Sequence, residues 1–316
     1  MIVIGIDVGG TSIKGAFINE KGTILSRFSM KVNKRSAPEK EVKELCSIIN
    51  KSIKDNKYTG KVSGIGIGMP GIMDFDSGLV INSPNLPTWN SFNLKSFIHK
   101  ETGLNVEINN DANVAALGEA TFGSGKKYKN IIMITLGTGV GGGIVIDGKI
   151  VDGHLHQGAE LGHMVISVGG RKCGCGRRGC FEAYASATAL IKETKKMMKR
   201  HPESLLYEVG HELGGVDARN AFVASKRGDK CAIKLVDEYV MYLSEGLINY
   251  CNIFRPEAII LSGGVANEGE YLFNKVKEYM AEHNFGMKGS PKVEILPSEL
   301  GYDSGKIGAA CLLLNK

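Results

Sequence analysis

The sequence predicts an α/β fold made of two similar halves. Apolar runs of strand length alternate with longer segments in which apolar residues recur at helical spacing. Residues 5–22, GIDVGGTSIKGAFINEKG, and residues 135–149, TLGTGVGGGIVIDGK, share one pattern of strand, Gly/Thr turn, strand and Gly turn. Because such self-similarity indicates a repeated structural unit, we expect two similar domains facing one another.

The composition is that of a globular protein. The chain has 316 residues, 43% of them hydrophobic and 23% charged, and this length suits about two domains. The net charge of +6 comes from scattered lysines in short runs, which favours solvated faces over a nucleic-acid surface. We expect no signal peptide and no membrane span, which needs roughly 18 to 20 apolar residues. Seven cysteines, an odd number, favour a reduced cytoplasmic chain over a disulfide framework.

The first half is expected to open with three strands and then to alternate helices with strands. Periodicity predicts strands at residues 2–8, 12–19, 24–30, 61–68 and 106–108, and helices at residues 39–53, 92–102 and 112–120. Residues 74–89, DFDSGLVINSPNLPTW, are typical of turns.

The second half repeats the opening pattern and then becomes largely helical. Strands are predicted at residues 131–136, 144–146, 258–261 and 293–296, and helices at residues 186–200, 218–226, 229–254, 270–283 and 304–314.

Glycine-rich turns follow three of the predicted strands. After Asp7, two glycines expose backbone N–H groups, Thr11 adds a hydroxyl, and Asp7 is suited to hold a metal ion through water. The alternative is an ordinary hairpin turn. Residues 137–143 form a second turn, and the two together are suited to hold the phosphates of one nucleotide. Residues 262–267, SGGVAN, form a third, which is either a contact with adenine or ribose or a simple turn before a helix.

Two polar residues are candidates for contacting a substrate hydroxyl. Asp111 is expected where a buried strand gives way to a helix, and ligands of open α/β sheets gather beyond the carboxyl ends of strands. A carboxylate there can accept a proton, or it can simply cap the helix. Asn85 is stiffened by Pro84 and Pro87, so its amide is either a sugar contact or part of a surface loop.

Three cysteines and a histidine have the spacing of a zinc site. Cys173, Cys175 and Cys180 follow His163 by ten residues or more, with glycines between them that let the chain wrap tightly. A Cys3His set is a closed tetrahedral ligand set, so we expect structural zinc in preference to unrelated thiols or a redox pair. Glu160 and Glu182 flank this segment, and the metal would order both carboxylates.

The order of these motifs resembles the ROK family of sugar kinases, within the actin, hexokinase and Hsp70 fold superfamily. The motifs are DVGGT, NNDAN, LGTGVGGG, GAELGH, CGCGRRGCFE and LSGGVAN, and they run from residue 7 to residue 267. The resemblance implies actin-like (ribonuclease H-like) domains at residues 1–110, with the helix at about 304–316 packed back on them, and at residues 111–303, with a zinc loop at 163–182. A homodimer is also implied.

The resemblance implies a role for each matching residue. Asp111 becomes the catalytic base, and ATP with Mg²⁺ is expected between the two Gly/Thr turns. The residues implied around the sugar are Gly71, Asn85, Asn110, Asp111, Glu160, His163 and Glu182. Those implied for the nucleotide are Asp7, Gly9, Gly10, Thr11, Lys14, Gly137, Thr138, Gly139, Gly263 and Gly264. Structural Zn²⁺ is implied on His163, Cys173, Cys175 and Cys180. Asn109 departs from the family, in which Glu often stands before Asn-Asp.

The implied activity is ATP-dependent phosphorylation of a hexose. SPNLPTW and SATALI resemble bacterial ROK glucokinases, so the expected reaction converts glucose to glucose 6-phosphate. Kinases of N-acetylmannosamine or N-acetylglucosamine share the motifs and remain alternatives. ROK regulators carry a helix-turn-helix at the N-terminus. A sugar-responsive regulator is therefore disfavoured, because the first strand is expected to begin at residue 2 and leaves no room for that module. An actin-like structural ATPase is disfavoured by the Cys/His cluster and the Asn- and Glu-rich cleft.

Overall fold

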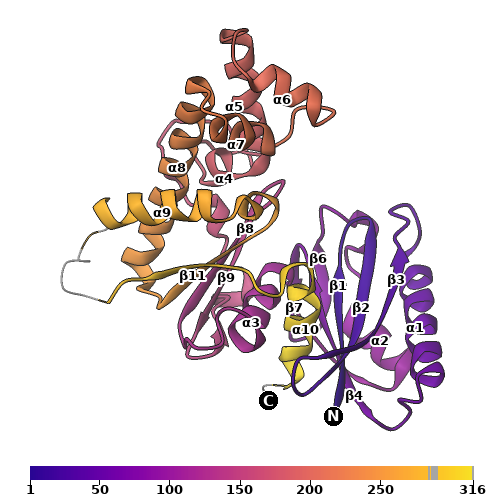
Figure 1. Ribbon diagram of the computed structural model, residues 1–316. Coiled ribbons are helices and arrows are strands. Elements are labelled where there is room, and N and C mark those ends of the chain that lie inside the picture. The colour runs from indigo at the N-terminus through magenta and orange to yellow at the C-terminus, as the bar shows by residue number, and fades with distance from the viewer. Residues whose placement is uncertain (284, 286–290, 315–316) are drawn as a thin grey trace. The chain divides into compact units, whose positions relative to one another are not determined.

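The computed structural model describes residues 1–283, 285 and 291–314, and its packing divides the chain into two units (Figure 1). The first unit comprises Met1–Asn130, Gly143–Ala159 and Glu299–Lys316. The second comprises Ile131–Gly142 and Glu160–Ser298. The domain limits expected from the sequence stay a prediction.

The two five-stranded sheets have the same strand order. One runs β3-β2-β1-β4-β7, and the other runs β10-β9-β8-β11-β12. In each, the first strand of the repeat is central and has its own hairpin partner on one side and a later, parallel strand on the other. The internal repeat read from the sequence is therefore confirmed as a repeated sheet topology. The strands are β1 (Ile2–Val8), β2 (Ser12–Asn19), β3 (Ile24–Lys31), β4 (Val62–Met69), β7 (Asn105–Asn110), β8 (Ile131–Leu136), β9 (Val140–Ile146), β10 (Lys149–Ile150), β11 (Ala258–Ser262) and β12 (Glu294–Pro297).

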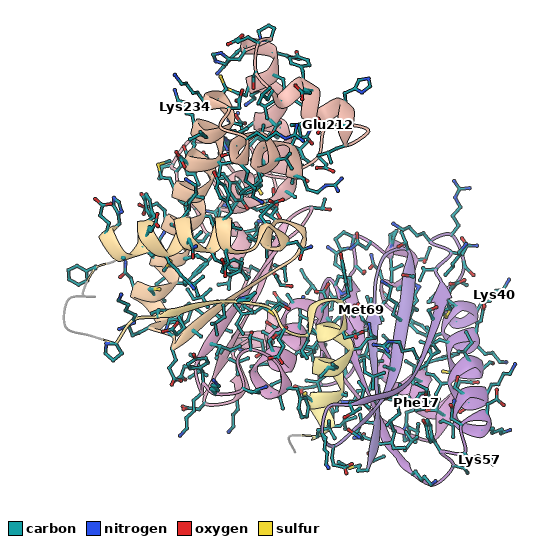
Figure 2. The ribbon with its side chains drawn as sticks, viewed as in Figure 1. Phe17, Lys40, Lys57, Met69, Glu212 and Lys234 are labelled. Atoms are coloured by element: carbon teal, nitrogen blue, oxygen red, sulfur yellow. The ribbon has the colours of Figure 1, made fainter. Side chains whose placement is uncertain are left out.

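Helices cover both faces of the first sheet. Strand residues that alternate along β1 divide between two apolar clusters, because successive side chains point to opposite faces. Ile4 and Ile6 pack with α1 and α2, whereas Val3 packs with α3 and α10. Figure 2 labels Phe17, which is fully buried in the first cluster, and Lys40 and Lys57, which are exposed. The helices are α1 (Pro38–Asp55), α2 (Leu94–Thr102), α3 (Asp111–Phe122) and α10 (Ser304–Leu314).

Helix α10 lies against the first sheet and α3 without side chains at the crossing points. A Cβ on Gly66 of β4 would overlap the carbonyl oxygen of Ala309. A Cβ on Gly308 would overlap the carbonyl oxygen of Val114 in α3. Neither glycine has a positive φ, so close approach and not turn geometry explains both residues.

A buried carboxylate joins the end of α3 to the segment that precedes α10. The Glu119 side chain is 0% exposed. Its oxygens accept hydrogen bonds from the backbone N–H groups of Ser124, Glu299 and Leu300 at 3.0, 3.2 and 2.9 Å. Several donors on one carboxylate compensate the loss of its hydration, so Glu119 fixes where the C-terminal segment returns to the first unit.

The second unit is largely helical around one long apolar helix. Helix α8 (Lys230–Phe254) buries Leu243, Leu247 and Tyr250 along one side. The remaining helices are α4 (Glu182–Ala185), α5 (Ala187–Arg200), α6 (Leu206–Glu212), α7 (Arg219–Lys226) and α9 (Glu270–His283). In the described part of the chain, no helix has the length and apolar character of a membrane span.

Most predicted elements agree with the structure, and β1, β2, β8, α9 and α10 agree residue for residue. The pattern does not predict β5 (Ile72–Asp74), β6 (Leu79–Asn82), β10, α4 or α6, and residues 140–143, expected in a turn, form the start of β9. The prediction of turns throughout residues 74–89 is therefore wrong for β6, which pairs with β5.

Candidate active site

Asp7 lies near the end of β1, just before the β1–β2 turn, between a lysine on the neighbouring strand β2 and the start of α10. Asp7 stands opposite Lys14 in the antiparallel register. A Cβ on Gly305 would lie 3.3 Å from the Asp7 carboxyl carbon, so a side chain there would crowd the carboxylate. Burial raises the pKa of the Asp7 carboxyl, while the charges of Lys306 and Lys14 act in the opposite direction.

Lys306 is a charged residue near this turn that the sequence analysis does not single out. Its side chain is almost fully buried, and its Nζ donates to the carbonyl of Tyr302 at 3.0 Å and lies 2.9 Å from Asp303 Oδ1. Arg27 also pairs with Asp303 at 2.6 Å. The available signal was a single lysine inside the otherwise apolar run SGKIGAACLLL.

Asn110, not Asp111, caps helix α3. The Asn110 side chain accepts from the backbone N–H groups of Ala112 and Asn113 at 2.9 and 3.4 Å. Asp111 is the first helical residue and is half-buried. The reading of Asp111 as a plain cap is therefore wrong, since the preceding asparagine fills that role.

Asn109, where the family often has Glu, belongs to an amide network beneath this helix start. Its Oδ1 accepts from Asn113 Nδ2 at 3.2 Å, and its Nδ2 donates to Asp152 Oδ2 at 3.3 Å. Both partners belong to the first unit. A side chain engaged in this way serves to hold the end of β7 and the first turn of α3.

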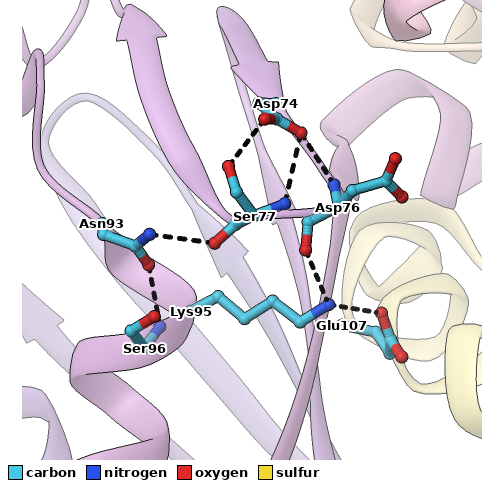
Figure 3. A network of polar contacts seen from close by, with 7 residues as sticks. All are labelled: Asp74, Asp76, Ser77, Asn93, Lys95, Ser96 and Glu107. Atoms are coloured by element: carbon cyan, nitrogen blue, oxygen red, sulfur yellow. Dashed lines mark hydrogen bonds and ion pairs between the residues drawn. The ribbon is translucent and has the colours of Figure 1, made fainter.

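Polar contacts anchor the loop that carries Asn85 (Figure 3). The Asp74 carboxylate accepts from the Ser77 hydroxyl at 2.7 Å. Lys95 on α2 lies 3.1 Å from Glu107 of β7. Asn93 caps α2 and donates to the Ser77 carbonyl at 3.0 Å. These contacts tie the β5–β6 hairpin to α2 and β7 at the base of the loop.

Asn85 and the first glycine turn lie side by side in the first unit. A Cβ on Gly10 would lie 3.1 Å from the Asn85 Cβ and 3.5 Å from the Lys34 Nζ. Lys34 is thus a further cation close to this turn that the motifs do not reveal. Gly71 has a φ of 109°, and a Cβ there would lie 2.5 Å from the Asn82 carbonyl oxygen, so only glycine fits.

The second and third glycine turns adjoin each other in the second unit. The carbonyls of Gly137 and Thr138 accept hydrogen bonds from Ala187 N and Thr188 Oγ1, both in the first turn of α5, at 2.8 and 2.7 Å. Gly263 has a φ of 88°, and a Cβ there would contact the backbone of Leu136, which precedes Gly137. The two turns therefore present their backbones in one region.

The predicted zinc ligands form one cluster in the second unit. The ligand atoms of His163, Cys173, Cys175 and Cys180 all lie within 4.8 Å of one another. His163 Nδ1 is 3.7 Å from Cys173 Sγ, and Cys175 Sγ is 3.7 Å from Cys180 Sγ. Ligands of a tetrahedral zinc ion are about 3.5 to 3.8 Å apart, given its usual bond lengths. The donor set and its spacing therefore fit the ion.

The protonation of these thiols depends on their surroundings. Burial raises the pKa of the Cys173 thiol to about 12, and burial likewise raises that of Cys180. A hydrogen bond from the Arg177 backbone lowers the pKa of Cys175. A cation among them would favour the thiolate forms, which are the ones that bind metal.

The predicted site residues are divided between the two units. The first unit holds Asp7, Gly9, Gly10, Thr11, Lys14, Gly71, Asn85, Asn110 and Asp111. The second holds Gly137, Thr138, Gly139, Glu160, His163, Cys173, Cys175, Cys180, Glu182, Gly263 and Gly264. Within the second unit, Glu182 is half-buried beside the Cys/His cluster, and Glu160 is exposed.

Comparison with known proteins assigns the chain to a family. The ROK family model matches residues 3–316. A glucokinase of Thermotoga maritima is 36% identical over 312 residues, covering 98% of this chain and 96% of that protein. A ROK glucokinase of Streptomyces griseus, solved with glucose and AMPPNP, has a TM-score of 0.80 at 33% identity and full coverage of both chains. A xylose repressor of Caldicellulosiruptor bescii is 33% identical, covering 90% of this chain and 71% of the repressor. The chain therefore belongs to the ROK family.

Proposed function

We propose that the chain is an ATP-dependent sugar kinase that converts glucose to glucose 6-phosphate. The observation that carries the proposal is similarity over nearly the whole chain to glucokinases, one of which was solved with glucose and an ATP analogue. Asp111 at the start of α3, with Asn110 as the cap, supplies the carboxylate that such a reaction needs.

Asp111 acts as the general base on the sugar hydroxyl that receives the phosphoryl group. A carboxylate that accepts the hydroxyl proton makes the oxygen a better nucleophile as its bond to phosphorus forms. The other residues of the sugar site position the ring through hydrogen bonds to its hydroxyls. They are Gly71, Asn85, Asn110, Glu160, His163 and Glu182.

The glycine turns hold the nucleotide through backbone N–H groups. Phosphoryl transfer depends mostly on positioning and on stabilising charge, so rigid turns without side chains suit it. Bound Mg²⁺ would neutralise charge on the phosphates, and the Asp7 carboxylate would help to hold it. The nucleotide residues are Gly9, Gly10, Thr11, Lys14, Gly137, Thr138, Gly139, Gly263 and Gly264, together with Asp7.

The Cys/His cluster holds a structural zinc ion. His163, Cys173, Cys175 and Cys180 give four protein ligands, which leave no open position for chemistry. The ion orders the segment that ends at Glu182.

We also propose that the chain acts in the cytoplasm, in keeping with its free cysteines. We further propose that it is a homodimer, which light scattering on the purified protein would test.

A coupled assay over several sugars tests the substrate. Sugar-dependent formation of ADP from ATP should be fastest, at equal concentration, with glucose among glucose, mannose, fructose, N-acetylmannosamine and N-acetylglucosamine. Faster turnover of an N-acetylated sugar would replace glucose with that alternative. No ADP formation with any sugar would overturn the kinase assignment.

A sugar-responsive regulator is the second candidate, because xylose repressors also match this chain. The chain spans 96% of the Thermotoga glucokinase but 71% of the Caldicellulosiruptor repressor. A regulator would bind sugar without forming ADP. The same assay, combined with calorimetric measurement of sugar binding, therefore distinguishes a regulator from a kinase.

Asp7→Asn should abolish most activity without destabilising the fold. Burial raises the pKa of Asp7, so the folded chain holds this proton more tightly than the unfolded chain does. The free energy of unfolding is therefore reduced once pH exceeds the folded pKa, and Asn removes that loss. At pH 7 we expect a melting temperature no lower than wild type and a turnover number reduced by about 10²-fold.

Thermal unfolding at neutral and acidic pH checks this prediction. The advantage of the variant over wild type should shrink as pH falls through the folded pKa of Asp7. A variant that is less stable at pH 7, or that keeps wild-type turnover, would contradict it.

A further inference from the structure

One carboxylate in the second unit contacts both the Cys/His cluster and the second glycine turn. Glu182 is the first residue of α4, directly after the CGCGRRGCF segment. Its Oε1 lies 3.4 Å from the Cys173 Sγ. Its Oε2 accepts from the backbone N–H of Val140 at 3.1 Å, across 42 residues of sequence. The Val140 N–H thus holds one oxygen of the carboxylate, and the other oxygen adjoins the cluster.

Gly139, the residue before Val140, has no side chain, and the Glu182 carboxylate occupies the space where one would lie. A Cβ on Gly139 would overlap Glu182 Oε2 and lie 3.4 Å from the Glu182 Cδ. Apart from the adjacent residues Thr138 and Val140, the described atoms within 4 Å of that Cβ all belong to Glu182. Gly139 does not have a positive φ, so its backbone is one that other residues adopt. The Glu182 side chain is therefore the steric reason for glycine here.

Gly137, two residues earlier in the same turn, provides the contrast. It also lacks a positive φ, and a Cβ there would meet nothing within 4 Å in the described part of the chain. A methyl group at Gly137 thus changes the turn without touching Glu182.

We infer that Gly139 is a positioning residue for Glu182: by lacking a side chain, it lets the carboxylate bind the Val140 N–H and so sets the affinity for the sugar. This inference rests on the proposed contact of Glu182 with the sugar. A turn that served only to bring backbone close to phosphate would affect nucleotide binding and leave sugar binding intact. The position of Gly139 also connects this turn to sugar recognition.

Calorimetric titration of glucose in the absence of nucleotide tests the inference. Gly139→Ala should weaken glucose binding by about tenfold or more, because an inserted methyl forces the carboxylate to move. Glu182→Ala should also weaken it. In the Glu182→Ala background, Gly139→Ala should cause no further loss, because the clashing carboxylate is absent. Gly137→Ala is the comparator, and its effect on glucose binding, if any, should be the same in both backgrounds.

Thermal unfolding provides a readout that does not depend on sugar or activity. If Gly139→Ala lowers the melting temperature, the double variant should regain at least part of the loss. Independent effects of the two substitutions on both measurements, or equal effects of Gly137→Ala and Gly139→Ala, would overturn the inference. Wild-type glucose affinity in Glu182→Ala would instead overturn the proposed sugar contact, and the melting temperatures would then still decide whether Gly139 accommodates Glu182.

Discussion

Asp111→Asn is expected to lower the turnover number by about 10² to 10⁴, the usual contribution of a general base. Asn has nearly the same shape and can still accept from the Ala112 N–H, as the Asp111 Oδ1 does at 2.9 Å. It cannot accept the proton of the sugar hydroxyl. Because Asn110 provides the cap of α3, the helix keeps its capping bonds in the variant.

Stability and sugar binding should change little in this variant. We expect a melting temperature close to wild type and a modest loss of glucose affinity, since one of several hydroxyl contacts becomes weaker. Sugar-dependent turnover at saturating ATP and glucose, together with thermal unfolding, measures both quantities. Turnover within about threefold of wild type, far below a general-base effect, would contradict the mechanism.

Asp229→Asn is the matched control, because Asp229 is a true helix cap. Its Oδ1 accepts from Ala232 N at 2.7 Å and from the Ser204 hydroxyl at 3.0 Å, and its Oδ2 accepts from Leu205 N at 3.0 Å. Asn retains one oxygen and so loses part of this set, which should cost about 1 kcal/mol of stability. Turnover should be unchanged. The two variants should therefore show opposite results. Asp111→Asn should lose turnover and keep stability, whereas Asp229→Asn should lose stability and keep turnover.

The sequence predicts the central strands of the sheets well because most of their residues are buried. Continuous apolar runs such as IVIGIDV and IIMITL have few alternative structures once they are bounded by glycine turns. The repeat of strand and turn then predicts that the two sheets share one topology, which they do.

Short elements escaped prediction because their own few residues carry too little pattern to specify them. β6 has four residues, and its place in a hairpin depends on pairing with β5. Helix α6 has seven residues, and its N-cap residue Leu205 gives no side-chain capping bond that would signal a start. For both, tertiary packing decides the structure.

In the candidate site, too, the sequence predicts the local motif but not the contacts between distant residues. The Cys3His spacing is local enough that the sequence alone predicts the cluster. The contact between Glu182 and Val140 joins residues 42 positions apart, and the burial of Lys306 beside Asp303 depends on how α10 packs. Residue type and spacing carry no signal for the first contact, and for the second they offer only a single lysine in an apolar run.

Loss of the metal should unfold the loop at residues 172–180 and weaken sugar binding. Apart from the cluster, backbone contacts such as Cys173 N to Arg177 O at 2.9 Å hold residues 172–180, whereas Arg171 is held separately by ion pairs with Glu238 at 3.1 Å and Glu193 at 3.6 Å. At its end, Phe181 is fully buried and packs edge-on to Tyr250 with ring centroids 6.0 Å apart. We therefore expect chelation to release the loop while Phe181 and α8 keep their packing.

Trypsin digestion with and without a chelator makes this loss visible. The loop contains three cleavage sites, Lys172, Arg177 and Arg178, which the metal-bound loop should protect. Elemental analysis should find one zinc per chain in wild type and a large reduction in Cys180→Ser. Glucose affinity should fall in parallel, because Glu182 follows the released segment.

Cys46→Ala is the control, because Cys46 is buried in the first unit and is not one of the predicted metal ligands. Removing a buried thiol from an apolar core should lower the melting temperature somewhat, yet zinc content and protection from trypsin should match wild type. If the ion is structural, the opposite result is expected for Cys180→Ser: zinc, protection from trypsin and glucose affinity should be lost together. If purified protein without metal were protected from trypsin and bound glucose normally, the cluster would be a set of thiols with no part in ordering Glu182.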